Sequence, residues 1–263
     1  DKVAARVTAF LDRVRARAGL AARATVTTEN SVPTASGLAS SASGFAALAL
    51  AASQAAGLAL SPTELSVLAR LGSGSAARSI FGGFAEMARG ARPDGTDAAA
   101  HPLSEGDGWD VRLVVAITAA GEKALGSTAA MRRTAETSPY YDAWVRGVDG
   151  DLAAARAAIA GRDLAALGAV AERSALRMHA SALAAEPAIL YWNGATVAAM
   201  ARVRALRAAG TPAFFTIDAG PHVKVLCPAR DAEEIADALS EVPGVLRTLV
   251  AAPGPGARLV EAG

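Results

Sequence analysis

A chain of 263 residues that is 52% hydrophobic and 19% charged has the composition of a globular protein, and it is long enough for two medium-sized domains or one large domain. Its formal net charge of +1 argues against a broad basic surface for nucleic acid or for an anionic membrane, so an anionic ligand would have to be bound by a local cluster of charge. The single cysteine, Cys227, excludes an internal disulfide framework and fits a reducing compartment, and the lack of any run of about 18 strongly apolar residues argues against a transmembrane helix.

The first predicted element is an amphipathic helix over residues 1–20, because the apolar side chains between positions 3 and 14 have the spacing of one helical face. Residues 23–28 alternate as a strand does, and residues 29–37 form the loop that follows. The sequence starts with Asp1 instead of Met, and no secretory signal opens it. We therefore expect native residues to precede Asp1.

Residues 33–56 join a small-residue loop to a long apolar helix. Between residues 38 and 51 the pattern is too apolar for a surface helix, so we expect this helix to be buried. A helix N-terminus carries unsatisfied N–H groups and about half a positive charge, so small residues there let phosphate oxygens approach, and Ser40, Ser41 and Ser43 add hydroxyl groups. The stretch fits either a phosphate-binding loop or a core helix that follows a Pro/Gly turn.

A second helix is predicted from the capping pattern at residues 61–64 to Leu71, where glycine ends it. Residues 72–84 then form a second small-residue loop with a short helix-like piece. If that piece is helical, Ser75 and Arg78 share a face and direct a hydroxyl and a guanidinium group to one ligand. The alternative is a flexible linker with a solvated arginine, although Ile80 and Phe81 argue against it.

The second half of the chain alternates strands and helices. Residues 88–109 are a turn-rich excursion that we interpret as a domain boundary, residues 111–118 are a strand, and 122–128 are a loop. The further predicted helices are 129–133, 140–148, 152–159, 164–183, 195–208 and 231–239, and the further predicted strands are 213–217, 222–226 and 245–251. A tight turn at residues 218–221 joins two of the strands. This order is that of a split βαβ, ferredoxin-like sandwich of the α+β class.

Five segments in sequence order carry a resemblance to a known family. PTASGLASSASGFAAL resembles the phosphate-binding loop of the superfamily that contains galactokinase, homoserine kinase, mevalonate kinase and phosphomevalonate kinase. GSGSAARSIFGGF, STAAMRRTAETSPYYDAW, MHASAL and FFTIDAGPHVKVL resemble the diphosphomevalonate decarboxylase family within it. The family's lysine- and tyrosine-containing KYWGK-type motif does not occur in these 263 residues.

The resemblance implies a two-domain GHMP-kinase fold. Residues 1–108 would be an ATP-binding domain of the ribosomal protein S5 domain 2-like type, truncated at its start, and residues 109–263 a ferredoxin-like domain. It also implies ATP-dependent decarboxylation of mevalonate 5-diphosphate to isopentenyl diphosphate, with ADP, phosphate and CO₂, in the mevalonate route to isoprenoids. We expect ATP with Mg²⁺, a cytoplasmic homodimer, and neither nucleic acid nor membrane as a partner; the sequence shows no evident set of metal ligands.

The resemblance also assigns residues to the site. Asp218 matches the carboxylate that orients or deprotonates the tertiary hydroxyl, and Arg78 the arginine that holds the substrate carboxylate. Substrate binding is assigned to Ser73, Gly74, Ser75, Arg78, Ser127 and Asp218, and ATP-phosphate binding to Gly37, Leu38, Ala39, Ser40, Ser41 and Ser43. Ser41 is expected nearest the transferred group and completes the catalytic set with Asp218 and Arg78.

Each assignment has a structural alternative. Asp218 would otherwise be an Asx-turn residue, Arg78 a surface arginine, and each serine a helix cap. We interpret His179 as a structural core residue. The aromatic side chains of residues 140–144 are interpreted as packing. Weaker candidates for extra charge, each expected to be solvated, are Lys123, Arg132 and His222.

Three alternative functions stay open. The chain could be a phosphomevalonate decarboxylase, or a mevalonate 3-kinase-type sibling that stops before decarboxylation. It could also be a noncatalytic ligand-binding relative. Asp218 and Arg78 together favour the full reaction, because a pure kinase needs no group to hold a carboxylate.

Overall fold

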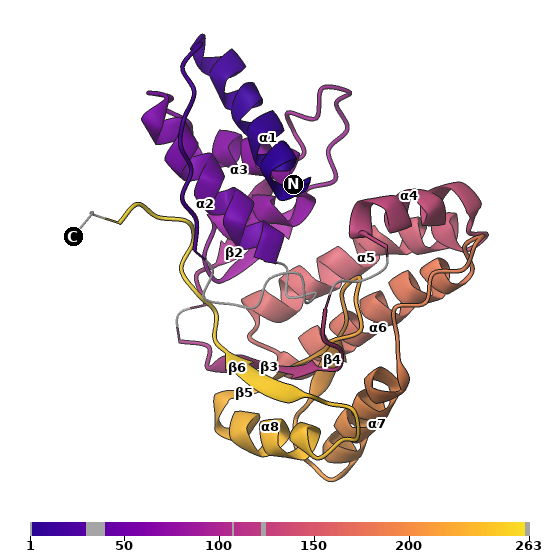
Figure 1. Cartoon of the computed structure of the whole chain (residues 1–263). Helices are drawn as coiled ribbons and strands as arrows, with labels where there is room; N and C mark the ends of the chain where they lie inside the picture. Colours follow the sequence, from indigo (N-terminus) through magenta and orange to yellow (C-terminus); the bar gives the residue numbers. More distant parts are fainter. Residues whose placement is uncertain (1, 30–39, 107, 122–124, 261–263) are drawn as a thin grey trace. The chain divides into compact units, whose positions relative to one another are not determined.

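A computed structural model of the chain describes residues 2–29, 40–106, 108–121 and 125–260 (Figure 1). These residues form two compact units, which are described separately below. The first unit contains residues 2–29, 40–106 and 253–260, and the second contains residues 108–121 and 125–252. The combination of helices with antiparallel sheet confirms the α+β class. Within the described ranges, no helix is long and apolar enough to cross a membrane.

Helices build most of the first unit: α1 (Lys2–Ala18), α2 (Ser40–Ala55), α3 (Pro62–Gly72) and the 3₁₀-helix η1 (Gly74–Ile80). The amphipathic helix α1 buries Phe10 and Val14, as its spacing predicts. The ring of Phe10 meets that of Phe45 in α2 edge to face, with centroids 5.4 Å apart, a geometry that aromatic pairs prefer. Helix α3 begins at the predicted place, because Ser61 and Glu64 form a capping box.

Helix α2 is less buried than its composition predicts. Phe45, Ala46 and Ala49 lie in the core of the first unit, but Ala47 and Ala51 are exposed along the opposite side. Alanine has the highest helix propensity and little apolar surface, so it is compatible with either side of a helix. The expectation of a fully buried helix is therefore wrong, and that of a long apolar helix is confirmed.

The strands of the first unit differ from those predicted. Strands β1 (Phe84–Met87) and β2 (Ala100–Ser104) pair in an antiparallel ladder, and neither was predicted; β2 lies within residues 88–109, which were expected to be a turn-rich excursion. The strand predicted at residues 23–28 is wrong: this segment is irregular and exposed. Alternation alone does not make a strand, because the backbone needs a neighbouring strand to satisfy its hydrogen bonds.

A four-stranded antiparallel sheet forms the centre of the second unit, in the order β4 (Phe214–Thr216), β5 (Val223–Pro228), β3 (Val111–Ile117), β6 (Arg247–Ala251). The chain order is one strand, several helices, two strands, a helix and a last strand. This confirms the split βαβ arrangement predicted from the sequence. All four predicted strands of this unit are found within a few residues of their expected limits.

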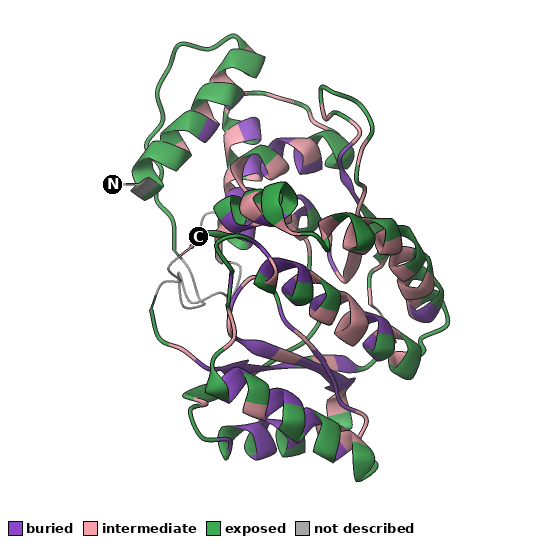
Figure 2. Cartoon of the chain, turned by 90° about the vertical axis from the view of Figure 1, so that its right-hand side faces the viewer, coloured by how far each residue is buried: buried purple, intermediate pink, exposed green. Residues whose placement is uncertain are grey.

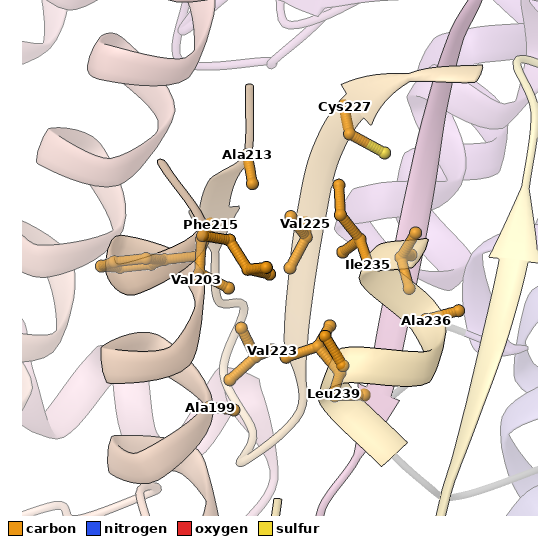
Figure 3. Close-up of a cluster of buried hydrophobic side chains, with 14 of the residues drawn as sticks. Ala199, Val203, Ala213, Phe215, Val223, Val225, Cys227, Ile235, Ala236 and Leu239 are labelled. Atoms are coloured by element: carbon orange, nitrogen blue, oxygen red, sulfur yellow. The ribbon is translucent and has the colours of Figure 1, made fainter. Parts of the chain in front are cut away.

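Helices cover both faces of this sheet: α4 (Ser127–Thr137), α5 (Tyr141–Ala160), α6 (Leu164–Leu183), α7 (Gly194–Ala208), the 3₁₀-helix η2 (Ala229–Asp231) and α8 (Ala232–Ser240). Helices α7 and α8 pack on one face, and α6 packs on the other, with α5 against it (Figure 1). Figure 3 shows the core on the α7 and α8 side, where Val203, Phe215, Val225 and Ile235 meet.

Alternate strand positions therefore have different surroundings. Phe215, Val223 and Val225 belong to the α7 and α8 face, so Thr216 and Lys224 belong to the α6 face. Figure 2 shows the buried residues gathered in the sheet and on the inner sides of the helices. Close packing on the α6 face depends on Gly168, because a Cβ atom there would lie 2.0 Å from the ring of Phe214.

Helix α5 replaces two predicted helices. A break was expected near Gly150, but the helix runs without interruption from Tyr141 to Ala160. Asp151 forms ion pairs with Arg173 and Arg177 of α6, at 2.8 Å and 3.0 Å. A glycine inside a helix costs only about 1 kcal/mol, and contact with a neighbouring helix overrides a cost of that size.

Candidate active site

In the first unit, the hydroxyl group of Ser73 lies between those of two other serines, one in α2 and one in η1. The Oγ atom of Ser73 lies 3.2 Å from that of Ser41 and 3.4 Å from that of Ser75. Ser73 ends α3 and precedes η1, but its hydroxyl caps neither helix. Ser73 is therefore a cap residue through its backbone alone, and its hydroxyl contacts the other two serines instead of a helix end.

A glycine allows α3 to end beside α2. A Cβ atom at Gly72 would lie 2.1 Å from the ring of Phe45, so any side chain there would push α3 away. The same small residue that ends the helix thus brings Ser73 within reach of Ser41. This close approach requires glycine at position 72.

Ser75 and Arg78 lie on one side of η1. The segment is a 3₁₀-helix, with three residues per turn, so side chains three apart lie above one another. This confirms that the two residues share a face and excludes the flexible linker. Arg78 is exposed, and its guanidinium group makes no hydrogen bond or ion pair with another described residue. A guanidinium group in this state can bind a planar carboxylate through two parallel hydrogen bonds.

A buried serine that the sequence analysis missed anchors η1. The Ser66 hydroxyl donates to the carbonyl of Ala77 at 3.0 Å and accepts from the N–H of Ala100 at 2.8 Å. These bonds connect α3, η1 and β2. Nothing in the pattern distinguishes Ser66 from an ordinary helical serine, because its two partners are distant in sequence.

The predicted ATP-phosphate residues are described only in part. Gly37, Leu38 and Ala39 lie outside the described residues, as does the side chain of Ser40. Helix α2 begins at Ser40 and has no acidic residue in its first turn, which suits an anion at its N-terminus. Ser41 is half-buried and Ser43 is exposed. The phosphate-binding role of this segment stays a prediction.

In the second unit, Asp218 follows β4 at the edge of the sheet. Its carboxylate is 65% exposed, and its Oδ2 atom lies 2.9 Å from Nζ of Lys224, whose side chain is 14% exposed. Lys224 is paired in register with Thr216, two residues before Asp218. Strand geometry thus places the two side chains on the same face. The sequence analysis did not predict Lys224, although the short turn between two alternating strands carried the signal.

Hydrogen bonds from several elements fix the turn after Asp218. The carbonyl oxygen of Asp218 accepts from the N–H of Gly220 at 2.7 Å and lies 3.1 Å from Nε2 of His179 in α6. The carbonyl of Pro221 accepts from the hydroxyl groups of Thr118 and Thr196, at 2.8 Å and 2.7 Å. The turn is therefore held from β3, α6 and α7.

His179 is buried, as expected for a structural residue. Because its partner is a carbonyl oxygen, Nε2 carries the ring proton and donates it. Burial lowers the pKa of His179, while hydrogen bonding to the backbone at Asp218 and Ile217 opposes this shift. The neutral ring supports the backbone from which the Asp218 carboxylate projects.

His222 is not solvated, so that expectation is wrong. The ring is buried, and its Nδ1 atom accepts from the N–H of Thr118 at 3.2 Å. Burial, with a smaller contribution from the Lys224 charge, lowers the pKa of His222 to about 4. His222 is therefore neutral near pH 7 and supplies no charge to a ligand.

The remaining candidates lie on or near α4 and α5 in the sequence. Ser127 is exposed and is the first residue of α4, where a loop was predicted. The rings of Tyr141 and Trp144 contact each other edge to face with centroids 5.8 Å apart, as expected for packing, but Tyr140 is exposed, so the packing interpretation is wrong for that residue. Arg132 is exposed, and Lys123 lies outside the described residues. Over the described ranges, no group of three or more His, Cys, Asp or Glu residues could hold a metal ion.

Two domain families match the chain. Residues 1–100 match the diphosphomevalonate decarboxylase-like N-terminal domain, and residues 113–249 match the mevalonate 5-diphosphate decarboxylase C-terminal domain. The curated diphosphomevalonate decarboxylase of Ganoderma lucidum is 38% identical over 220 residues, which are 81% of this chain and 55% of the relative. The chain thus spans about half the length of the curated relatives it matches.

Solved structures agree with the sequence matches. The crystal structure of mevalonate diphosphate decarboxylase from Staphylococcus aureus has a TM-score of 0.92 and 38% identity, with 99% of this chain and 79% of that chain covered. A structure described as MDDEF in complex with MVAPP, AMPPCP and magnesium has a TM-score of 0.90 and 42% identity, with 100% and 80% covered. The fold is therefore the GHMP-kinase fold that the resemblance implied.

Proposed function

This chain belongs to the diphosphomevalonate decarboxylase family, and we propose that the protein converts mevalonate 5-diphosphate and ATP to isopentenyl diphosphate, ADP, phosphate and CO₂. The observation that carries the proposal is the guanidinium group of Arg78, which has no partner among the described residues and shares one side of a 3₁₀-helix with Ser75. A kinase that only phosphorylates a hydroxyl group needs no such group for a carboxylate.

The tertiary hydroxyl of the substrate must first become a leaving group. Its O–H bond breaks as its oxygen bonds to the γ-phosphorus of ATP, and ADP leaves with the electron pair of the broken P–O bond. Asp218 accepts the hydrogen bond or the proton of the hydroxyl. Its carboxylate suits this role because it is mostly exposed, while its backbone is fixed by hydrogen bonds.

Decarboxylation follows from the loss of the new phosphate. As the C–O bond to phosphate breaks, the bond between the carboxylate carbon and its neighbour supplies the electron pair of the new double bond, and CO₂ leaves. Arg78 would hold the carboxylate in one orientation before this step. Ser73, Ser75 and Ser127 would bind the diphosphate, and Ser41 with the start of α2 would bind the phosphates of ATP.

Mg²⁺ would accompany ATP and neutralise phosphate charge during the transfer. The solved relative that contains AMPPCP and magnesium supports this assignment.

The test is turnover of the full-length protein that contains this chain. Mevalonate 5-diphosphate, mevalonate 5-phosphate and mevalonate should be compared at saturating ATP, with both ADP and CO₂ measured. We expect the highest kcat/KM for the diphosphate. A preference for the monophosphate would favour a phosphomevalonate decarboxylase, and a stable 3-phosphate product would favour a 3-kinase. ATP binding without ADP formation would favour a noncatalytic relative.

We also infer a cytoplasmic homodimer that needs neither nucleic acid nor membrane. The single cysteine supports a reducing compartment, and the near-zero net charge argues against a polyanionic partner. The dimer is inferred from the family resemblance. Light scattering of the full-length protein would test it, with a mass of one protomer contradicting it.

A further inference from the structure

The proposed reaction gives no role to Lys224, a charged residue on β5 beside the edge strand β4. Its side chain is only 14% exposed, and its Nζ atom lies 2.9 Å from Oδ2 of Asp218. A lysine at such a position is restrained by the strand that carries it. The structure therefore pairs the proposed catalytic carboxylate with an ammonium group from the neighbouring strand.

The surroundings of Lys224 contain no competing acidic group among the described residues of α6. Glu172 of α6 binds Arg207, and both Arg173 and Arg177 bind Asp151. His179, also in α6, is neutral because burial lowers its pKa. From β3, the register partner is the apolar residue Val115.

The remaining neighbours of Lys224 add no further charged partner among the described residues. Helix α7 packs on the opposite face of the sheet, and His222, just before the strand, is neutral near pH 7. Asp218 is thus the acidic partner that the described structure gives to Lys224. An opposite charge at this distance favours the ionised carboxylate and restricts its rotation.

We propose that Lys224 is a positioning residue for Asp218: the ammonium group keeps the carboxylate ionised and in one orientation, ready for the substrate hydroxyl. This inference rests on the proposed function, because it assumes that Asp218 acts on the hydroxyl. Lys224 takes no part in the proton transfer, and the transferred proton goes from the hydroxyl to Asp218. The backbone of Asp218 is held by His179 and Gly220, and Lys224 holds its side chain.

Removal of the charge tests the proposal. Lys224→Met should lower kcat by about 10–100-fold, while KM for mevalonate 5-diphosphate changes by less than about threefold, because the carboxylate is misplaced but the diphosphate contacts remain. Lys224→Arg keeps a cation and should recover most of the lost kcat. Arg112→Met is the matched control, since Arg112 pairs with Asp110 at the other end of the same sheet and should leave both parameters unchanged.

A double-mutant cycle separates positioning from a general structural effect. If Lys224 acts through Asp218, Lys224→Met should lower kcat by less than about twofold in an Asp218→Asn background. An equal factor in both backgrounds would overturn the proposal, as would wild-type kcat in Lys224→Met. The acidic limb of the kcat/KM pH profile should also move to higher pH in Lys224→Met and stay in place in Lys224→Arg.

Lysine NMR distinguishes failure of this inference from failure of the proposed function. The sequence contains three lysines, so in ¹³C-lysine-labelled protein the Cε signal of Lys224 is the one removed by Lys224→Arg. That signal should follow the titration of a carboxylate in the acid range, and Asp218→Asn should abolish the response. If the wild-type protein shows no turnover, the proposed function fails while this titration still tests the pairing. If the pH dependence of the Lys224 Cε signal is the same in Asp218→Asn as in the wild type, the inference is refuted.

Discussion

Asp218 is the single residue whose change should affect turnover most. Asp218→Asn keeps the size of the side chain and removes the anionic oxygen, so kcat should fall by about 10²–10⁴-fold. Nucleotide binding, measured by titration calorimetry with a nonhydrolysable ATP analogue, should be almost unchanged. Asp163→Asn is a control, since Asp163 only caps α6. Full activity of Asp218→Asn would remove Asp218 from the mechanism.

Arg78 should be sensitive to geometry as well as to charge. Arg78→Ala should reduce kcat by about 10²-fold, because the substrate carboxylate loses its orientation. Arg78→Lys keeps the charge but not the planar pair of donors, so it should recover only part of this loss. Steady-state kinetics with ADP and CO₂ measured in parallel checks both variants. If Arg78→Lys equals the wild type, simple charge attraction explains the role of Arg78.

His222 gives the protein a defined acid sensitivity. Its folded-state pKa of about 4 lies below its ordinary value of 6.5, so between these values the unfolded chain binds the additional proton. The contribution of His222 to stability is thus complete above pH 6.5 and is lost as the pH falls to about 4. The free energy of unfolding falls by at most about 3 kcal/mol through this residue.

Urea denaturation at pH 7, 5.5 and 4.5 measures this effect. His222→Asn can still accept the N–H of Thr118, and its free energy of unfolding should fall less steeply with pH than that of the wild type. His101→Asn is the control, because His101 is exposed on β2. Equal slopes for wild type and His222→Asn would contradict the assignment.

At the residue level, the sequence identified the candidate residues that lie within motifs. It missed the residues that hold these candidates in place. Ser73, Ser75 and Arg78 are adjacent in sequence, and η1 places two of them on one side. Ser66 and Lys224 became visible only through partners far along the chain or across a turn. His222 was wrongly expected in solvent, because the sequence does not show which strand face is covered.

At the element level, the 3₁₀-helix η1 depends on the buried hydroxyl of Ser66. Ser66→Ala would leave the N–H of Ala100 without its acceptor, at a cost of about 1–3 kcal/mol in the free energy of unfolding. Ser79→Ala, in η1 itself, should change stability by less than about 0.5 kcal/mol. Chemical denaturation compares the two. Equal stability of Ser66→Ala and wild type would show that the hydroxyl is not the anchor of η1.

Helices were predicted better than strands in the first unit, and the reason is physical. Capping and apolar spacing are local, so α1 and α3 appear in the sequence near their observed limits. Strands β1 and β2 depend on each other across a turn-rich segment, and residues 23–28 have the alternation but pair with no strand in the described part of the chain. In the second unit, the four strands alternate regularly in sequence, and their order among the helices predicted the topology.

At the level of the whole molecule, the composition argued against some classes of protein, and the motifs indicated one family. The near-zero net charge argues against a polyanionic partner, and a helix that could cross a membrane is not found among the described residues. The order of five short segments then indicated the family that the domain matches confirm. The division into domains at residues 1–108 and 109–263 stays a prediction, as do the roles of the phosphate-loop residues.

The central claim is that phosphorylation of the hydroxyl leads to loss of CO₂. The most direct test supplies the full-length protein with ATP, Mg²⁺ and mevalonate 5-diphosphate labelled with ¹⁴C in the carboxyl group, and counts ¹⁴CO₂ against ADP. We predict equal amounts of the two products throughout the reaction. ADP formation without ¹⁴CO₂ would contradict the account, because it would describe a kinase that stops at the phosphorylated alcohol.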